Sequence, residues 1–491
     1  MEVMAEALAY IFSPWGVICL LLGIGVAMVV GPLPGLGGTT GMVLVLPFVI
    51  QLPPEAGILV FIGIAAVLHT SDTVTSVLFG VPGTGGSMAT IVDGYPMARK
   101  GEGARALAAG FTASLIGGIV GAVFLLATVP VMHQLLQIMR SPELLMMALM
   151  GLTMVSVLTK GAPLIGLALA ALGLLMGQVG LHWSTGIGRW TFAQLYFETG
   201  VPLLPVLLGV FGFAEITNLV MQGSTISVMG QEVGKGRWQG VKDVFHHWWL
   251  ALRCSAIGVW IGIIPGVGSS IVDWLAYGHA VQTEKHGESF GTGDVRGVIA
   301  PETSNNAKAG AALLPTLAFG VPGSQSMVVM LAAFTMMGIV PGPRLFTEMP
   351  HFIFVIIWGL ALANIVGCLL CFALTPLLAK ICKIPPCILG PVVMMFFFIG
   401  AQTATTTMMD VYLLVFFGIF GYILKRLEIP RVPFAMGFIL GNIVERYLTI
   451  SDAAYGAAWL MRPGVIAIGL LTIAGVVYST RGKKTSKGEQ R

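Results

Sequence analysis

Two glycine- and proline-rich breaks interrupt apolar stretches of the sequence, and their composition suits the binding of small ions. The first, residues 31–40, reads GPLPGLGGTT, and the second, residues 262–270, reads GIIPGVGSS. Free backbone N–H groups and the N-terminus of a helix attract negative charge, whereas free carbonyl oxygens hold a cation such as Na⁺. The hydroxyl groups that end each break add donors for a carboxylate. We therefore expect a carboxylate site and an adjoining cation site at these breaks.

A second pair of breaks repeats in the same order. The pentapeptide Phe-Gly-Val-Pro-Gly occurs at 79–83 and, unchanged, at 319–323, an offset of 319 − 79 = 240 residues. The Pro-Gly pairs at 34–35 and 265–266 are 265 − 34 = 231 residues apart. Two ordered motifs at nearly equal offsets indicate an internal duplication. A weaker echo pairs residues 173–177 with 437–441.

The expected substrate-binding residues come from the four breaks and from one neighbouring polar run. They are Gly35, Gly37, Thr39, Thr40, Pro82, Gly83, Thr84, Gly266, Gly268, Ser269, Ser270, Asn305, Asn306, Pro322, Gly323, Ser324 and Gln325. Glycines four residues apart, as at 31 and 35 or 262 and 266, also allow close helix packing, which is the alternative role for them. The adjacent prolines and hydroxyl runs favour a binding site.

Charged side chains in apolar surroundings are the expected cation-coupling groups. They are Asp72, Asp273 and Glu302. An ionisable residue inside a membrane segment is a functional candidate by default, because its burial is costly. Lys308 lies in the same surroundings, so an ion pair with Glu302, or simple placement at the membrane interface, is the alternative.

The composition is that of an integral membrane protein. Hydrophobic residues make up 56% of the 491 residues and charged residues only 10%, against about 25% charged in soluble domains. Apolar stretches of about twenty residues recur, and no alternation typical of a β-barrel is visible. The net charge of +4 is concentrated in loops and the C-terminal tail, which indicates orientation in a membrane and no nucleic-acid partner.

The expected fold is an all-α polytopic membrane protein of about 12 transmembrane segments, including broken or re-entrant helices, in two inverted-topology repeats. The stretch at 41–50 is too short to cross a membrane alone, which favours a half-helix or a re-entrant segment. The expected units are a first repeat at 1–225, a cytoplasmic linker at 226–246, a second repeat at 247–480 and a basic cytoplasmic tail at 481–491.

Loop charges predict the orientation. Counting spans backwards from a cytoplasmic tail places the basic residues of 99–105, 231–246 and 425–431 on the cytoplasmic side. The loops after the two Phe-Gly-Val-Pro-Gly copies then fall on opposite faces, which predicts inverted repeats. The N-terminus has Glu2 and Glu6 but no basic residue before the first span, so we expect it outside and without a cleaved signal peptide.

Three other kinds of chemistry are disfavoured by the sequence. Residues 80–87 resemble a phosphate-binding loop, but Gly86 stands where the lysine is required, so we expect no ATP binding. The adjacent His246 and His247 diverge by about 100° on a helix, which favours interfacial anchoring over metal binding. No His, Glu and Asp constellation with catalytic spacing appears, so we expect neither an enzyme nor a cofactor.

At these breaks the sequence resembles the large membrane subunit of the tripartite tricarboxylate transporter family. The segments that carry the resemblance run through nearly the whole chain: Pro34-Gly35, Pro82-Gly83-Thr84, 93–98 (DGYPMA), 264–268 (IPGVG), Ala300-Pro301-Glu302, Asn305-Asn306-Ala307, 320–324 (GVPGS) and Pro341-Gly342-Pro343. The resemblance implies a bacterial inner-membrane permease that imports carboxylates. It also implies two partners, a small four-span membrane subunit and a periplasmic substrate-binding protein.

Energetics favours coupling to a cation gradient. Moving one negative charge inward against an inside-negative potential costs about 2.3 kcal/mol per 100 mV, so a trianion faces roughly 7 kcal/mol. We therefore expect a Na⁺- or H⁺-coupled secondary transporter. The alternative is a passive carboxylate channel or facilitator that uses the same Gly/Pro loops.

Overall fold

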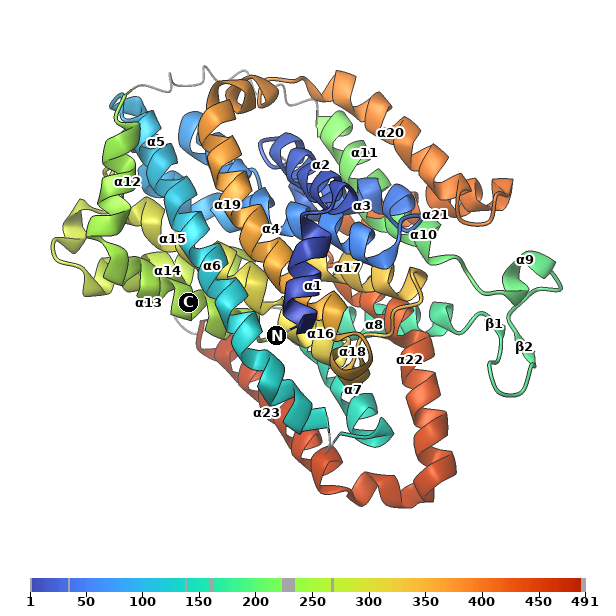
Figure 1. Ribbon diagram of the computed structural model, residues 1–491. Helices are drawn as coiled ribbons and strands as arrows, with labels where there is room; N and C mark the ends of the chain where they lie inside the picture. Colours follow the sequence, from blue (N-terminus) through green and yellow to red (C-terminus); the bar gives the residue numbers. More distant parts are fainter. Residues whose placement is uncertain are drawn as a thin grey trace.

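The chain folds into a set of packed helices, with one two-stranded antiparallel ladder (Figure 1). The structure is a computed structural model, and it describes residues 2–33, 36–136, 139–158, 163–222, 235–265 and 269–486. The ladder, with the short helix α9 beside it, projects from one edge of the molecule (Figure 1). The expected all-helical fold is thus confirmed.

The elements of the first half run from residue 2 to residue 222. They are α1 (Glu2–Ile11), α2 (Pro14–Val30), α3 (Gly37–Val49), α4 (Pro54–Phe79), the 3₁₀ turn η1 (Gly85–Ser87), α5 (Met88–Arg99), α6 (Gly103–Leu136), α7 (Ser141–Leu158), α8 (Pro163–Gly177), β1 (Gly180–Leu181), β2 (Gly188–Arg189), α9 (Leu195–Glu198), α10 (Leu203–Leu207), the π-helix η2 (Leu208–Phe213) and α11 (Ala214–Gln222). The stretch 41–50 lies mostly in α3, which has 13 residues, and its role as a half-helix or re-entrant segment stays a prediction.

The elements of the second half begin at residue 237. They are α12 (Arg237–His246), α13 (Trp248–Gly262), α14 (Ser269–Thr283), η3 (Gly287–Ser289), α15 (Arg296–Ala311), α16 (Leu313–Phe319), α17 (Gln325–Met336), α18 (Pro343–Glu348), α19 (Pro350–Ile381), α20 (Pro386–Gln402), α21 (Met408–Arg426), α22 (Val432–Tyr455), η4 (Gly456–Met461) and α23 (Pro463–Ser486). Part of the expected linker at 226–246 is thus the helix α12, and the four predicted unit boundaries stay predictions.

Five helices are long and apolar enough to cross a membrane. They are Pro54–Phe79, Gly103–Met132, Leu203–Met221, Pro350–Ile381 and Met408–Arg426. Two further spans result if each bent pair counts as one, because α1 and α2 meet at 66° and the α22–η4 segment meets α23 at 67°. Other apolar helices of the described chain have 10–17 residues, fewer than the roughly 20 that a crossing needs. The protein is a multi-pass membrane protein with five to seven candidate spans, and the count of about 12 stays a prediction.

Helix α4 is the centre of the core. Its most apolar 18-residue window is 94% buried, because α2, α5, α6, α15 and α19 all pack against it. A helix that is apolar on every side is stable inside a protein when other helices bury all of its faces. The polar residues in its C-terminal half, from Thr70 to Ser76, are therefore held inside the protein and not at a surface.

The first glycine of the duplicated pentapeptide adopts the same backbone conformation in both copies. Gly80 ends α4 with φ 66° and ψ 23°, and Gly320 ends α16 with φ 65° and ψ 22°. This left-handed conformation favours glycine, which explains the residue at both positions. A hydroxyl then caps the next helix, since Thr84 accepts from the Gly86 amide and Ser324 from the Met327 amide. The two copies are therefore alike at the glycine that ends one helix and at the hydroxyl that caps the next, while their inverted orientation stays a prediction.

The weaker echo marks a direct helix contact. A Cβ atom on Gly173 of α8 would lie 2.1 Å from the Phe434 carbonyl, and one on Gly437 of α22 would lie 2.1 Å from the Ala170 carbonyl. Only glycine allows the two backbones to approach this closely. The segments 173–177 and 437–441 therefore pack against each other across the two halves.

Close packing also accounts for the first glycine of each long break. A Cβ atom on Gly31 would lie 2.0 Å from the Ser71 hydroxyl oxygen, and one on Gly262 would lie 2.7 Å from the Ala311 Cβ. The packing role considered for these two glycines is thus supported by the structure.

Candidate functional site

A cavity of about 220 Å³ lies where three of the four breaks meet. Its walls consist of residues 36–40, 84–86 and 324–327 from those breaks, Ala65, Leu68 and His69 from α4, Phe211 and Glu215, Lys308 and Ala309 from α15, and Arg431. Residues 266–268 of the remaining break lie outside the described part of the chain. The two halves of the sequence therefore build one cavity together.

Two helix N-termini face this cavity. Helix α3 begins at Gly37, and Gly37, Thr39 and Thr40 line the cavity. Helix α17 begins at Gln325 behind its cap residue Ser324, and both residues line the cavity. The first amides of a helix have no partner within the helix, and the helix dipole adds partial positive charge there. Both ends are therefore suited to an anion.

Two basic side chains add positive charge to the cavity wall. Lys308 on α15 is 2% exposed, and it lies within electrostatic reach of Asp273. Arg431 directly precedes α22, and its Nη1 donates to the Val210 carbonyl at 3.0 Å. Its guanidinium carbon lies 5.6 Å from the centre of the Phe211 ring. Because an arginine fork matches a carboxylate, this wall is suited to an organic acid.

Glu215 is the one acidic side chain in the described cavity lining. Its Oε1 accepts from Arg431 and its Oε2 accepts from Lys425 on α21. The Glu215 carboxylate thus lies between the basic groups of Lys425 and Arg431, which are 210 and 216 positions away in the sequence.

Asp72 lies next to the cavity, on α4, and is fully buried. Its Oδ2 accepts from the Thr84 hydroxyl and lies 3.8 Å from Nδ1 of His69. Its Oδ1 is buried without a hydrogen-bond partner among the described residues. Thr84, directly after the pentapeptide at 79–83, thus engages one oxygen of Asp72, while the other oxygen is unpaired among the described residues.

Glu302 on α15 is held by hydroxyl groups of the first half. Its Oε2 accepts from Thr73 of α4 at 2.9 Å and from Ser114 of α6 at 3.0 Å, and its Oε1 accepts from Thr90 of α5 at 2.7 Å. The ion pair with Lys308, considered above as the alternative role of Glu302, stays an untested alternative. Glu302 therefore ties α15 to three helices.

Asp273, on the first turns of α14, is a fully buried carboxylate. It is 0% exposed, and neither carboxylate oxygen has a hydrogen-bond partner in the described part of the chain. It lies within electrostatic reach of Asp72, Glu302 and Lys308. Lys308 offsets part of this buried charge, and a proton or a cation at the unpaired oxygens would offset the rest, since buried charge is very costly.

The two adjacent asparagines of α15 each present one unpaired oxygen. Nδ2 of Asn305 donates to the Gly86 carbonyl at 2.7 Å, and Nδ2 of Asn306 donates to Thr70 at 3.0 Å and to Asn364 at 3.1 Å. The Oδ1 atoms of both asparagines are buried without a hydrogen-bond partner among the described residues. These amide oxygens are further potential ligands of a cation.

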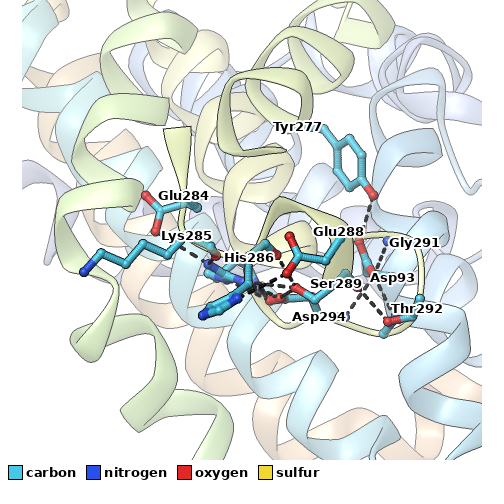
Figure 2. A network of polar contacts seen from close by, with 12 residues as sticks. Asp93, Tyr277, Glu284, Lys285, His286, Glu288, Ser289, Gly291, Thr292 and Asp294 are labelled. Atoms are coloured by element: carbon cyan, nitrogen blue, oxygen red, sulfur yellow. Dashed lines mark hydrogen bonds and ion pairs between the residues drawn. The ribbon is translucent and has the colours of Figure 1, made fainter. Parts of the chain in front are cut away.

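A network around Asp93 of α5 fixes the connection between α14 and α15 (Figure 2). Oδ1 of Asp93 accepts from the amides of Gly291, Gly293 and Asp294 at 2.8, 2.8 and 2.9 Å. Oδ2 accepts from the Tyr277 hydroxyl at 2.9 Å. Because Asp273 and Asn305 lie on the two connected helices, this carboxylate positions them.

The same connection contains an ion pair. Nη2 of Arg296 donates to Oδ2 of Asp294 at 2.6 Å, and the Ser289 hydroxyl donates to the same oxygen. Burial acts to raise the pKa of Asp294, but the hydrogen bonds from Arg296 and Ser289 outweigh it and hold the pKa at about 2. Asp294 is therefore ionised at every physiological pH.

The predicted site residues fall into three groups. Those that line the cavity are Gly37, Thr39, Thr40, Thr84, Ser324 and Gln325. Those that lie outside its described lining are Pro82, Gly83, Pro322, Gly323, Asn305, Asn306, Asp72, Asp273 and Glu302. Gly35, Gly266 and Gly268 lie outside the described residues, and of Ser269 and Ser270 only the backbone, at the start of α14, is described.

Sequence reasoning missed two charged residues of the cavity, Glu215 and Arg431. Arg431 was counted among the basic loop residues that predict orientation. Glu215 lies inside an apolar stretch, Leu203–Met221, and the rule that an intramembrane charge is a functional candidate would have found it.

The chain matches the family model of the tripartite tricarboxylate transporter TctA family over residues 17–436. A relative from Agrobacterium vitis, an uncharacterised 52.8 kDa protein of the TAR-I ttuC' 3' region, is 29% identical over 483 residues, which cover 96% of this chain and 95% of the relative. A second protein of that organism, from the TAR-II ttuC' 3' region, is 32% identical over 234 residues, 46% of this chain and 97% of the relative. No solved structure matches.

The family match spans the cavity and the helices that carry its basic and acidic groups. Membership of a tripartite family implies partner subunits and a role in transport, and it excludes an enzyme. The chain therefore belongs to the TctA family, the large membrane subunit of the tripartite tricarboxylate transporters.

Proposed function

We propose that this chain is a cation-coupled secondary transporter, driven by Na⁺ or H⁺, that imports tricarboxylates or related carboxylates across the bacterial inner membrane. A periplasmic binding protein delivers the substrate, and a small four-span membrane subunit completes the complex. The N-terminus lies outside and the C-terminus in the cytoplasm. The observation that carries the proposal is the cavity between the breaks, where two helix N-termini, Lys308 and Arg431 converge.

The cavity supports a small organic acid as substrate. Its volume of about 220 Å³ is below the roughly 300–1,000 Å³ of pockets for drug-sized ligands. Lys308 and Arg431 supply two positive charges against the single carboxylate of Glu215. The hydroxyl of Thr39 and those of its neighbours in the cavity wall add donors for the remaining carboxylate oxygens.

The unpaired buried oxygens near the cavity support a coupling-ion site. Asp72 and Asn305 each present one such oxygen and Asp273 presents two. The turn η1 and its cap link the first two, since Thr84 donates to Asp72 and the Gly86 carbonyl accepts from Asn305. Helix α14, which carries Asp273, packs against the same turn. A Na⁺ ion or a proton bound there satisfies these oxygens and brings in positive charge with the substrate.

Glu302 has a different role in this proposal. Three hydroxyl groups occupy its carboxylate oxygens, so it is less accessible to Na⁺ than Asp273 is. If the coupling ion is H⁺, we expect Glu302 to bind and release the coupled proton among these three hydroxyl groups. If the coupling ion is Na⁺, we expect Asp72 and Asp273 to bind it.

The test is uptake in proteoliposomes that contain both membrane subunits and the binding protein, with Na⁺ and H⁺ gradients imposed separately. Asp273→Asn should abolish gradient-driven accumulation while carboxylate binding persists. Asp410→Asn is the matched control, because Asp410 is equally buried but its oxygens accept from Tyr196 and Thr405. Full accumulation by the Asp273→Asn variant would refute the proposed ion site, and uptake that ignores both gradients would favour a passive facilitator.

A further inference from the structure

The ion-pair network at Glu215 has the geometry of an occupied carboxylate site. Arg431 is a fixed guanidinium in the cavity wall, and one oxygen of Glu215 accepts its hydrogen bond. The other oxygen of Glu215 accepts from Lys425, which is not part of the described cavity lining. The side chains of Glu215 and Arg431 are both 15% exposed, so neither charge is screened by bulk water as a surface pair is.

Arg431 does not depend on Glu215 for its position. A π-helix, Leu208–Phe213, precedes Glu215, and π-helical turns are rare and frequent at functional sites. This turn supplies both the Val210 carbonyl that accepts from Nη1 and the Phe211 ring beneath the guanidinium. Arg431 therefore stays in place when its carboxylate partner changes.

Lys425 gives Glu215 a second partner, which lies outside the described cavity lining. A buried or half-buried carboxylate that loses one basic partner is destabilised unless another remains. Because Lys425 already holds Oε2, Glu215 can leave Arg431 without becoming an unpaired charge. Arg431 in turn stays paired if an incoming carboxylate takes the oxygen position that Glu215 gives up.

We propose that Glu215 is an exchangeable internal carboxylate, which occupies Arg431 in the empty cavity and yields it to a carboxylate of the substrate. The exchange rests on the proposed carboxylate transport and adds a selection rule to it. A substrate with two or more carboxylates can engage Arg431 and Lys308 together, whereas a monocarboxylate must displace Glu215 for a single new ion pair. The cavity thus favours di- and tricarboxylates over monocarboxylates.

The test is calorimetric titration of the purified chain with citrate, succinate and acetate as tri-, di- and monocarboxylate probes. The Glu215→Gln variant, which no longer competes for Arg431, should bind citrate at least tenfold more tightly than the wild-type chain. The matched control is Glu445→Gln, because Glu445 is also 15% exposed and doubly paired, with Arg189 and His182, but lies outside the described cavity lining. Its citrate affinity should equal that of the wild type.

A double-variant cycle separates competition from positioning. Arg431→Gln should weaken citrate binding at least tenfold and should remove the gain from Glu215→Gln when the two are combined. If Glu215→Gln does not fold, Glu215→Asp keeps the charge with a shorter reach and should bind citrate more tightly than the wild type.

Three outcomes would overturn the exchange. If Glu215→Gln binds citrate no better than wild type while Arg431→Gln still loses binding, Glu215 only positions Arg431 and the proposed transport function stands. If acetate binds as tightly as citrate, the selection rule fails. If the wild-type chain binds none of the three probes but does bind another class of solute, the exchange and the proposed function fall together.

Discussion

Replacing Asp93 should loosen the connection between α14 and α15, because one carboxylate holds that connection in place. Three backbone amides at 2.8–2.9 Å donate to one of its oxygens, and the Tyr277 hydroxyl donates to the other at 2.9 Å (Figure 2). Asp93→Ala leaves the three amides unpaired at about 1–3 kcal/mol each. Since such losses are not additive, we expect a destabilisation of about 3–5 kcal/mol.

Two milder variants calibrate this value. Asp93→Asn keeps an acceptor oxygen for the three amides and loses only the charge, so we expect about 1–2 kcal/mol. Tyr277→Phe removes one hydrogen bond to a carboxylate and should cost a similar amount.

The assay combines the thermal midpoint of the purified protein in detergent with limited trypsin digestion. Lys285, exposed at the start of the connection, reports local loosening through its cleavage rate. Asp93→Ala should lower the midpoint most and accelerate this cleavage most. An Asp93→Ala protein with the midpoint and cleavage rate of Tyr277→Phe would refute the reasoning.

Three further predictions follow from the cavity and the packing. Lys308→Gln should weaken carboxylate binding by about 10- to 100-fold, the value of one charge-assisted hydrogen bond, in the calorimetric titration, and unchanged affinity would remove Lys308 from the site. Gly437→Ala should lower the thermal midpoint, because its Cβ would lie 2.1 Å from the Ala170 carbonyl, whereas Gly25→Ala, with no atom within 4 Å, should leave it unchanged. The stabilising effect of the Asp294 ion pair is complete above pH 4 and is lost as the pH falls towards about 2, since the pKa is depressed by folding. The difference in thermal midpoint between wild type and Asp294→Asn should therefore shrink from pH 5 to pH 3, and a constant difference would contradict the assigned pKa.

The sequence predicted the breaks well because their signal is local. Gly80 and Gly320 end helices in the same left-handed conformation, and the short apolar stretch after Gly37 is a helix of 13 residues. Glycine, proline and length act within a few residues, so no tertiary information was needed. The number of spans was harder to predict, because an apolar helix of 10–17 residues can be buried in protein without crossing a membrane.

The cavity could be predicted only in part, because long-range contacts decide which residues share it. Thr39, Thr84 and Ser324 were predicted from their breaks and do line one cavity. Arg431 joins them only through packing against the π-helix at Leu208–Phe213, a contact that spans more than 200 residues and leaves no periodic signal in the sequence. The role of Asp93 is visible only in the structure, where the amides of Gly291 and Gly293, far along the chain, surround its carboxylate.

The most direct test of the central claim is the uptake of a tricarboxylate into proteoliposomes that contain the complete complex, measured before and after both cation gradients are collapsed. We predict accumulation against the substrate gradient that stops when the coupling gradient, of Na⁺ or of H⁺, is removed. Uptake that continues at the same rate without either gradient would contradict the account and identify a passive facilitator.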